Sequence, residues 1–274
     1  MKIWLGGKLR GADDARVSVL DHGLTVGDGV FETLKAQNGR AFAVSRHLDR
    51  LAASARGLGL PEPDRDEVRH ACEAVLAANP LPYGRLRITY TGGLSPLGSD
   101  RGTARPTLVV ALGEAKPSPD STAVITVDWV RNERGALTGL KTTSYAENVL
   151  ALARAREQGA SEALFANTVG QLCEGTGSNV FVVLDGVPHT PPLSSGCLAG
   201  ITRALTAEWT GARETELPMD VLDRAEEIFL TSTLRDVQAV HRVGDRTLPG
   251  APGPVTAKAM RVFAERSAAD PDPA

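Results

Sequence analysis

The stretch GDGVFET, residues 27–33, begins the segment that decides how the first part of this 274-residue chain folds. It runs into a strand-like segment at residues 30–37, and a shorter one follows at residues 41–44. Between them stands Asn38-Gly39, a pair that favours a tight hairpin turn because both residues tolerate a positive φ. We therefore predict an antiparallel hairpin, followed by a helix with Ser45 as its N-cap.

Working outward from the hairpin, the first part of the chain continues with helices and strands. Apolar residues recur at helical spacing from position 47 to position 58, and a second helix is predicted over residues 64–79. Strand-like runs lie at residues 2–5, 85–91 and 107–112. The following stretch holds Pro117 and Pro119, which makes it the best candidate for a linker.

Strands and helices alternate after this linker. Strands are predicted at residues 123–130 and 227–231, helices at 145–158, 201–210 and 255–267, and a frayed tail at 268–274. This order predicts a mixture of α/β and α+β structure in two domains. The boundaries are a smaller N-terminal α/β domain at 1–116, a linker at 117–121 and a larger C-terminal domain at 122–274, with a cleft between the domains.

Composition excludes several classes of protein. Hydrophobic residues make up 42% of the chain, which is too many for a disordered protein. A net charge of -3 and only 4% aromatic residues give no basis for binding nucleic acid. Three dispersed cysteines indicate neither a metal site nor disulfides and favour the reducing cytoplasm. No apolar run is long enough for a membrane helix.

The common catalytic motifs are absent. Gly175-Thr176-Gly177 lacks the third glycine of a dinucleotide loop, and there is no Walker A sequence. The five histidines form no zinc-binding pair, and no nucleophile elbow exists. P-loop enzymes, zinc hydrolases and triad hydrolases are therefore excluded, and no metal is expected.

Several polar, glycine-rich segments remain, and together they suit a phosphorylated cofactor. Gly200-Ile201-Thr202 opens a helix, whose free N–H groups favour an anion, and Ser232-Thr233 ends a strand with further donors. Arg50 is a candidate partner for the same phosphate. Lys141 stands before a helix as a Schiff-base lysine would. Glu174 could keep a pyridine nitrogen protonated.

The order of these motifs resembles the fold-type IV pyridoxal-phosphate enzymes, from Asp21 through Val240. This family includes branched-chain aminotransferases, D-amino-acid aminotransferases and 4-amino-4-deoxychorismate lyases. The resemblance implies pyridoxal 5′-phosphate as the cofactor and the two-domain fold of the D-amino-acid aminotransferases.

Matching the motifs implies a role for each candidate residue. Lys141 is the expected catalytic lysine that carries the cofactor, and Glu174 the partner of its ring nitrogen. The remaining cofactor ligands are Arg50, Asn179, Gly200, Ile201, Thr202, Ser232 and Thr233. Substrate contacts are expected from Phe31, at the position of a tyrosine in D-amino-acid enzymes, and from Arg87, where branched-chain enzymes carry a basic ligand.

Each candidate also has an ordinary structural interpretation. Arg50 could be a surface partner on its helix, Gly200-Ile201-Thr202 a mere helix start, and Arg87 a residue of the strand surface. We interpret Glu32 as structural. Tyr145, four residues after the lysine, could bind the cofactor or simply pack. The protein could also belong to a different functional class, that of relatives that bind the cofactor without catalysing a reaction. The presence of both Lys141 and Glu174 argues against this interpretation.

The predicted reaction is the conversion of 4-amino-4-deoxychorismate to 4-aminobenzoate and pyruvate. Residues 98–106 contain Arg101 and Arg105 but lack the Arg-x-His pair of D-amino-acid aminotransferases, which favours the lyase. The alternative is an aminotransferase that acts on a D- or branched-chain amino acid, or an amine, and a 2-keto acid. The resemblance also implies a cytoplasmic homodimer with small-molecule substrates, and residues 17–20 are either an interface strand or core.

Overall fold

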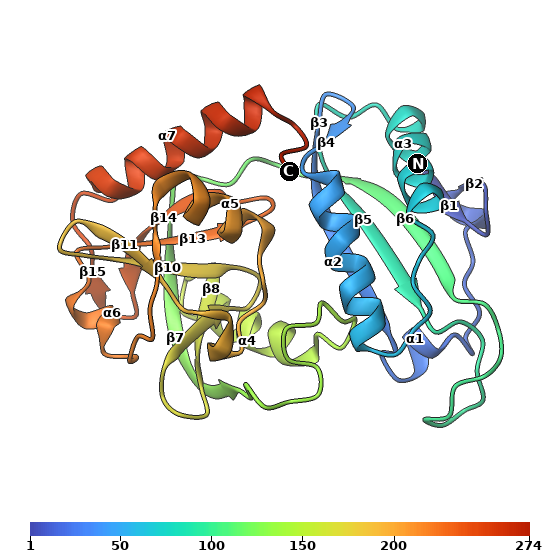
Figure 1. Ribbon diagram of the computed structural model, residues 1–274, viewed down its shortest axis with the longest axis horizontal. Coiled ribbons are helices and arrows are strands. Elements are labelled where there is room, and N and C mark those ends of the chain that lie inside the picture. Colours follow the sequence, from blue (N-terminus) through green and yellow to red (C-terminus); the bar gives the residue numbers. More distant parts are fainter. The chain divides into compact units, whose positions relative to one another are not determined.

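The computed structural model describes residues 1–274, which divide into two compact units (Figure 1). Unit 1 comprises Met1–Pro117, Leu140–Tyr145 and Asp270–Ala274, and unit 2 comprises Ser118–Gly139 and Ala146–Ala269. Both contain sheets and helices, as the predicted fold class requires. The segments 140–145 and 270–274, which we assigned to the C-terminal domain, instead pack with unit 1, because their backbones bond to it.

Unit 1 is built on an antiparallel sheet of six strands in the order β2-β1-β6-β5-β3-β4. The strands are β1 (Lys2–Leu5), β2 (Leu9–Gly11), β3 (Gly29–Gln37), β4 (Arg40–Ala41), β5 (Tyr83–Thr91) and β6 (Thr107–Glu114). The helices are α1 (His22–Thr25), α2 (Val44–Gly57) and α3 (Arg65–Ala78), with a 3-10 turn at Ala12–Asp14. The predicted hairpin joins β3 to β4, and φ is positive at both Asn38 (50°) and Gly39 (77°).

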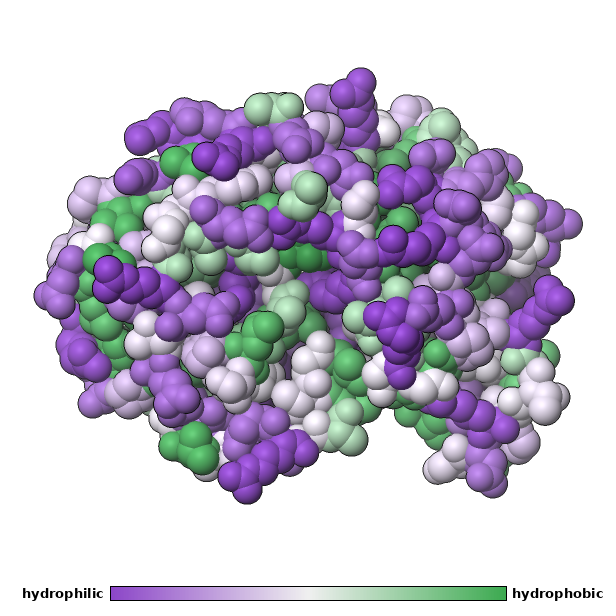
Figure 2. All heavy atoms as spheres, in the orientation of Figure 1, coloured by the Kyte–Doolittle hydropathy of each residue, from purple (hydrophilic) through white to green (hydrophobic).

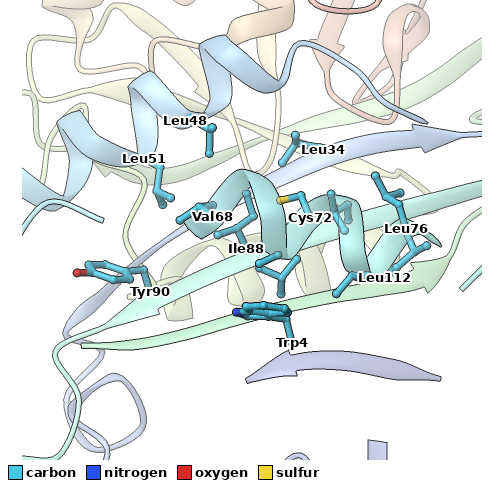
Figure 3. Packing of buried hydrophobic residues seen from close by; sticks show 14 of the residues in the cluster. Trp4, Leu34, Leu48, Leu51, Val68, Cys72, Leu76, Ile88, Tyr90 and Leu112 are labelled. Atoms are coloured by element: carbon cyan, nitrogen blue, oxygen red, sulfur yellow. The ribbon is translucent and has the colours of Figure 1, made fainter. Parts of the chain in front are cut away.

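Helices α2 and α3 supply the hydrophobic side chains that cover one face of this sheet (Figure 3). Residues of β3 alternate between faces, so Val30 and Leu34 point into this core together with Leu48 and Leu51 of α2. Glu32 shares the core face and is fully buried. Its odd-numbered neighbours, including Phe31, point to the other face.

The start of α2 differs from the prediction. Its N-cap is Ala43, in the left-handed conformation, rather than Ser45. The N–H of Ser45 donates to Asp272 Oδ1 (2.8 Å) and its hydroxyl to Asp272 Oδ2 (2.7 Å), while the N–H of Ala43 donates to the Pro271 carbonyl (2.7 Å). The C-terminal residues therefore cap this helix instead of fraying.

Unit 2 contains a nine-stranded mixed sheet with the order β12-β11-β10-β13-β14-β7-β8-β9, in which β15 pairs with β14. Strands β14, β7 and β8 are parallel neighbours, as are β11 and β12, and the other pairs are antiparallel. The strands are β7 (Ser121–Arg131), β8 (Glu162–Asn167), β9 (Leu172–Gly175), β10 (Asn179–Leu184), β11 (Val187–Thr190), β12 (Arg213–Glu214), β13 (Glu227–Ser232), β14 (Asp236–Val243) and β15 (Arg246–Thr247). The helices are α4 (Ala146–Glu157), α5 (Ile201–Thr210), α6 (Val221–Arg224) and α7 (Pro254–Ala269), with a 3-10 turn at Leu193–Ser195.

The sheet of unit 2 is buried on both faces. Val124 and Leu164 belong to a hydrophobic cluster with residues of α6, whereas Ile125 and Phe165 pack with the alanines of α4. Successive residues of β7 and β8 thus serve opposite faces, which explains why these strands read as continuous apolar runs. On the molecular face shown in Figure 2, hydrophobic residues lie in small groups among hydrophilic ones. No helix combines the length and the apolarity needed to cross a membrane.

Candidate active site

The segment that carries Lys141 extends the sheet of unit 1 along the free edge of β3. The N–H of Phe31 donates to the Lys141 carbonyl (2.9 Å), and the N–H of Thr143 donates to the Gly29 carbonyl (2.8 Å). On the side of α2, the N–H of Lys141 donates to the Ser54 hydroxyl (3.1 Å). Three hydrogen bonds to two elements thereby fix the backbone around the lysine.

Glycines at the edge of β3 and at the end of α2 permit this close approach. A Cβ on Gly27, whose φ is +72°, would lie 2.6 Å from the Ser144 hydroxyl, and one on Gly57 would lie 2.5 Å from the Leu140 side chain. A Cβ on Gly29 would come within 3.1 Å of the Thr143 hydroxyl. The glycines of the GDGVFET stretch therefore leave room for the lysine segment.

The amine of Lys141 lies among aromatic groups of unit 1. Its Nζ donates to the Tyr145 hydroxyl (3.2 Å) and lies 4.3 Å from the centre of the Phe31 ring. The two aromatic rings meet edge to face with centres 4.9 Å apart. Tyr145, whose role the sequence left open, thus contacts the lysine amine directly.

Arg87 contacts the same phenylalanine. Its guanidinium lies 3.3 Å from the centre of the Phe31 ring, and Nη1 is 3.5 Å from the Thr33 hydroxyl. Burial lowers the pKa of Arg87 to about 10, so the side chain stays charged at neutral pH. No acidic side chain forms an ion pair with it. A half-buried cation without a carboxylate partner is suited to bind an anionic group of a substrate.

Arg50 belongs to a buried cluster on the core side of β3. Its Nε and Nη2 donate to the two carboxylate oxygens of Glu32 at 2.8 and 2.7 Å, and His47 Nδ1 lies 2.6 Å from Glu32 Oε2. Burial alone would raise the pKa of Glu32, but Arg50 and His47 outweigh it and lower the pKa to about 2. Glu32 therefore holds Arg50 in place as a charged partner, in line with the structural role we predicted for it.

In unit 2, Glu174 is held through both of its carboxylate oxygens. The Leu198 N–H donates to Oε2 (2.9 Å), and Arg131 Nε lies 3.2 Å from Oε1. The side chain is 15% exposed, and an ionised carboxylate accepts hydrogen bonds through both of its oxygens. This is the chemistry that a protonated ring nitrogen requires.

Asn179, the next predicted cofactor ligand, supports the start of helix α5. Its Nδ2 donates to the Leu198 carbonyl (2.9 Å), and a Cβ on Gly200 would lie only 2.0 Å from its Oδ1. Gly200 is the N-cap of α5 and no side chain caps the helix, so the N–H groups of the first turn, at Ile201 and Thr202, lack a side-chain acceptor. These groups suit an anion.

The last predicted ligands, Ser232 and Thr233, lie at the end of β13 and are half-buried. The preceding residue, Thr231, has a buried hydroxyl with no hydrogen-bond partner. Together the chain offers a lysine amine, a fixed carboxylate, a helix N-terminus and hydroxyl groups. This set fits the aldehyde, ring nitrogen and phosphate of pyridoxal phosphate. Of the predicted residues, Phe31, Arg50, Arg87 and Lys141 lie in unit 1, and all the others lie in unit 2.

Sequence reasoning missed His47 and Arg131. A signal for His47 existed, because an acid at position 32 on the apolar face of a strand needs a buried partner, and His47 and Arg50 are three residues apart on one helix. Arg131 had no such signal. It reaches Glu174 only because β8 lies between β7 and β9 in the sheet.

Known sequences resemble this chain over most of its length. The model of the family "Amino-transferase class IV" matches residues 29–243. A protein of Methanocaldococcus jannaschii provisionally named a branched-chain-amino-acid aminotransferase is 35% identical over 258 residues, which are 90% of each chain. A D-alanine aminotransferase of Listeria monocytogenes is 30% identical over 283 residues and covers 97% of this chain and 96% of its own.

Solved structures show the same fold. The branched-chain aminotransferase of Thermoproteus uzoniensis has a TM-score of 0.91 at 28% identity and covers 97% of this chain and 94% of its own. A PLP-bound hypothetical aminotransferase of Mycobacterium tuberculosis scores 0.87 at 29% identity, with 98% and 100% covered. A Legionella pneumophila protein provisionally named a 4-amino-4-deoxychorismate lyase scores 0.85 at 25% identity, with 91% and 95% covered.

Proposed function

Because the chain belongs to the class IV aminotransferase family, whose enzymes use pyridoxal phosphate, we propose that it transfers an amino group from a D- or branched-chain amino acid to a 2-keto acid. The reaction needs an amine that can bond to the cofactor and move a proton, an acid for the ring nitrogen, and a group that binds the substrate carboxylate. Lys141, Glu174 and Arg87 are the candidates for these three tasks.

Each candidate residue would contact a different part of the cofactor. Lys141 would bind its aldehyde carbon, Glu174 its ring nitrogen, and Arg50 with the first turn of α5 its phosphate, supported by Ser232 and Thr233. When bound, pyridoxal phosphate withdraws electrons from the substrate carbon that loses a proton. Lys141 Nζ would take that proton from Cα and deliver it to the aldehyde carbon of the cofactor, which is the proton shift that amino-group transfer needs. The hydrogen bond to Tyr145 would orient the amine.

One observation carries the choice of substrate class. The Lys141 amine and the Arg87 guanidinium both contact the Phe31 ring, at 4.3 and 3.3 Å from its centre. A substrate whose amine lies beside the lysine amine can therefore place a carboxylate on the arginine, which forms no ion pair with a protein acid. Amino acids have this combination of groups, with one carbon between amine and carboxylate.

The comparisons change the order of our two candidate reactions. We predicted the lyase first, but the relatives above 30% identity carry the names of aminotransferases, and the lyase resemblance rests on the Legionella protein at 25% identity. The missing Arg-x-His pair still separates this chain from D-amino-acid enzymes. We therefore place the aminotransferase first and keep the lyase, which yields 4-aminobenzoate and pyruvate, as the second candidate.

A single assay set distinguishes the candidates. Purified protein with pyridoxal phosphate is incubated with 2-oxoglutarate and a panel that includes L-leucine, L-valine, D-alanine and D-glutamate, and separately with aminodeoxychorismate. We expect a keto acid to form from at least one amino acid, and the K141A variant to form none. Release of 4-aminobenzoate and pyruvate, without any amino-group exchange, would contradict the proposal and support the lyase.

We also propose that the protein is a homodimer. Residues 17–20 are neither a strand nor core, because Val19 is 74% exposed, and Leu97 on a neighbouring loop is 79% exposed. The two loops are joined by a hydrogen bond from the Ser95 N–H to the Leu20 carbonyl, so the two exposed apolar residues lie on adjoining loops of unit 1. Light scattering should give twice the chain mass for the wild type and the monomer mass for a V19D/L97D variant.

The same proposal includes a cytoplasmic location. Cys72, Cys173 and Cys197 are all buried and unpaired. Free thiols of this kind are typical of proteins in a reducing compartment. Fractionation of cells that express the protein should recover it with the cytoplasmic enzymes.

A further inference from the structure

We infer that Arg131 is a positioning residue that fixes Glu174 for its contact with the cofactor ring nitrogen, an inference that rests on the proposed function. Arg131 is the last residue of β7, and its side chain is only 13% exposed. Its Nε lies 3.2 Å from Glu174 Oε1 without the alignment of a hydrogen bond, so the contact is an ion pair.

The sheet places the two side chains together. Glu174 on β9 stands opposite Phe165 on β8, so both side chains lie on one face of the sheet. The guanidinium of Arg131 lies over this Phe165 ring, 4.0 Å from its centre. The ring is fully buried and provides a rigid base for the arginine. The cation next to Glu174 therefore has a fixed position.

Arg131 and Leu198 hold the carboxylate from two sides. Arg131 contacts Oε1, and the Leu198 N–H donates to Oε2, so rotation of the carboxylate would break one contact or the other. The Leu198 carbonyl in turn accepts hydrogen bonds from Asn179 and from the Gly200 N–H. The acid for the ring nitrogen and the helix start for the phosphate are thus joined through one peptide.

Arg131 also places a positive charge beside the carboxylate of Glu174. A carboxylate in this position can accept a hydrogen bond from a protonated ring nitrogen and stabilise its positive charge. Arg131 has a second acid partner, Glu147 of α4, whose Oε2 is 2.6 Å from Nη1. Glu147 is half exposed and does not contact Glu174, which makes it the matched control.

The test compares R131Q, R131K and E147Q with the wild type. Apoprotein is titrated with pyridoxal phosphate, and visible absorbance gives the dissociation constant. We expect R131Q to raise it about tenfold and to lower kcat about tenfold with KM for the amino donor within twofold. R131K keeps the charge but loses the planar contact with Phe165. Its dissociation constant and kcat should therefore lie between those of the wild type and R131Q. E147Q should match the wild type.

A double-mutant cycle separates positioning from mere folding. If Arg131 acts through Glu174, R131Q should change the dissociation constant by less than twofold in an E174Q background. An equal loss in both backgrounds would overturn the inference, as would an R131Q protein that binds the cofactor like the wild type. A wild-type protein that binds no pyridoxal phosphate would instead overturn the proposed function itself.

Discussion

The carboxylate of Glu32 accepts two hydrogen bonds from the guanidinium of Arg50, at 2.8 Å from Nε and 2.7 Å from Nη2, in a place where the acid has no contact with solvent. This fork fixes the plane of the Arg50 guanidinium. His47, at 2.6 Å from Oε2, completes the cluster. The cluster connects the stability of unit 1 to the proposed phosphate contact.

Removing the charge of Glu32 should be costly. An E32Q variant leaves the buried Arg50 cation with a neutral partner, and breaking a buried ion pair in this way costs about 3–5 kcal/mol. Urea denaturation of the apoprotein should show a loss of this size. E62Q, which breaks an ion pair between exposed side chains with Arg56, should change the free energy of unfolding by about 0.5 kcal/mol or less. Equal effects of the two variants would contradict the role of the buried cluster.

The same acid makes stability depend on pH. The pKa of Glu32 is lowered in the folded protein to about 2 from an ordinary value of 4.5, since Arg50 and His47 outweigh the effect of burial. Its contribution to stability is therefore fully present above pH 4.5 and is lost as the pH falls toward 2. The difference in unfolding free energy between wild type and E32Q should shrink between pH 5 and pH 3. A difference that stays constant over this range would contradict the assignment.

His22 predicts a second pH effect of the opposite sign. Its Nδ1 lies 3.0 Å from Asp28 Oδ2 and its Nε2 lies 2.9 Å from the Gly98 carbonyl. The protonated ring can donate to both partners, because the Asp28 carboxylate and the Gly98 carbonyl both accept hydrogen bonds. Hydrogen bonds to Asp28 and Gly98 raise the pKa of His22, although burial and the charge of Arg101, which is bonded to the same Asp28, oppose the shift.

The stabilisation by His22 is therefore present below pH 6.5 and is lost as the pH rises through the raised pKa. Above that value the loop around Gly98 should loosen, and hydrogen exchange at its backbone amides, corrected for intrinsic rates, should accelerate. An H22N variant should show this acceleration at every pH. H70N, a histidine that packs against Trp4, is the control and should keep the pH dependence of the wild type.

Local signals in the sequence predicted most elements, because their causes lie within a few residues. Asp64 caps α3 through the N–H groups of Asp66 and Glu67, and α5 covers residues 201–210 as predicted. The predicted N-cap of α2 was wrong because the side chain that accepts from the Ser45 N–H belongs to Asp272, which is 227 residues away in the sequence. The surroundings of Lys141 and Arg131 could not be predicted for the same reason, because both residues contact strands that are distant in the sequence.

The distant cap of α2 gives a prediction. In D272A the N–H and hydroxyl of Ser45 lose their acceptors, and loss of a helix cap costs about 1 kcal/mol. Because α2 carries Arg50, the phosphate contact should also weaken, which a higher dissociation constant for pyridoxal phosphate would reveal. E265Q, on the exposed face of α7, should leave both quantities unchanged. A D272A protein as stable as the wild type would exclude a capping role for Asp272.

The role of Arg87 is tested by pairing it with Arg85, which lies two residues earlier on the same face of β5 but is exposed. R87Q removes a cation that no protein acid neutralises, so the substrate carboxylate loses a charge-assisted hydrogen bond worth about 1.5–3 kcal/mol. KM for the amino acid should rise roughly 10- to 100-fold with a smaller change in kcat. R85Q should behave as the wild type. An amine without a carboxylate should react equally well with R87Q and wild type, and a loss of both activities in parallel would show that Arg87 supports only the packing of Phe31.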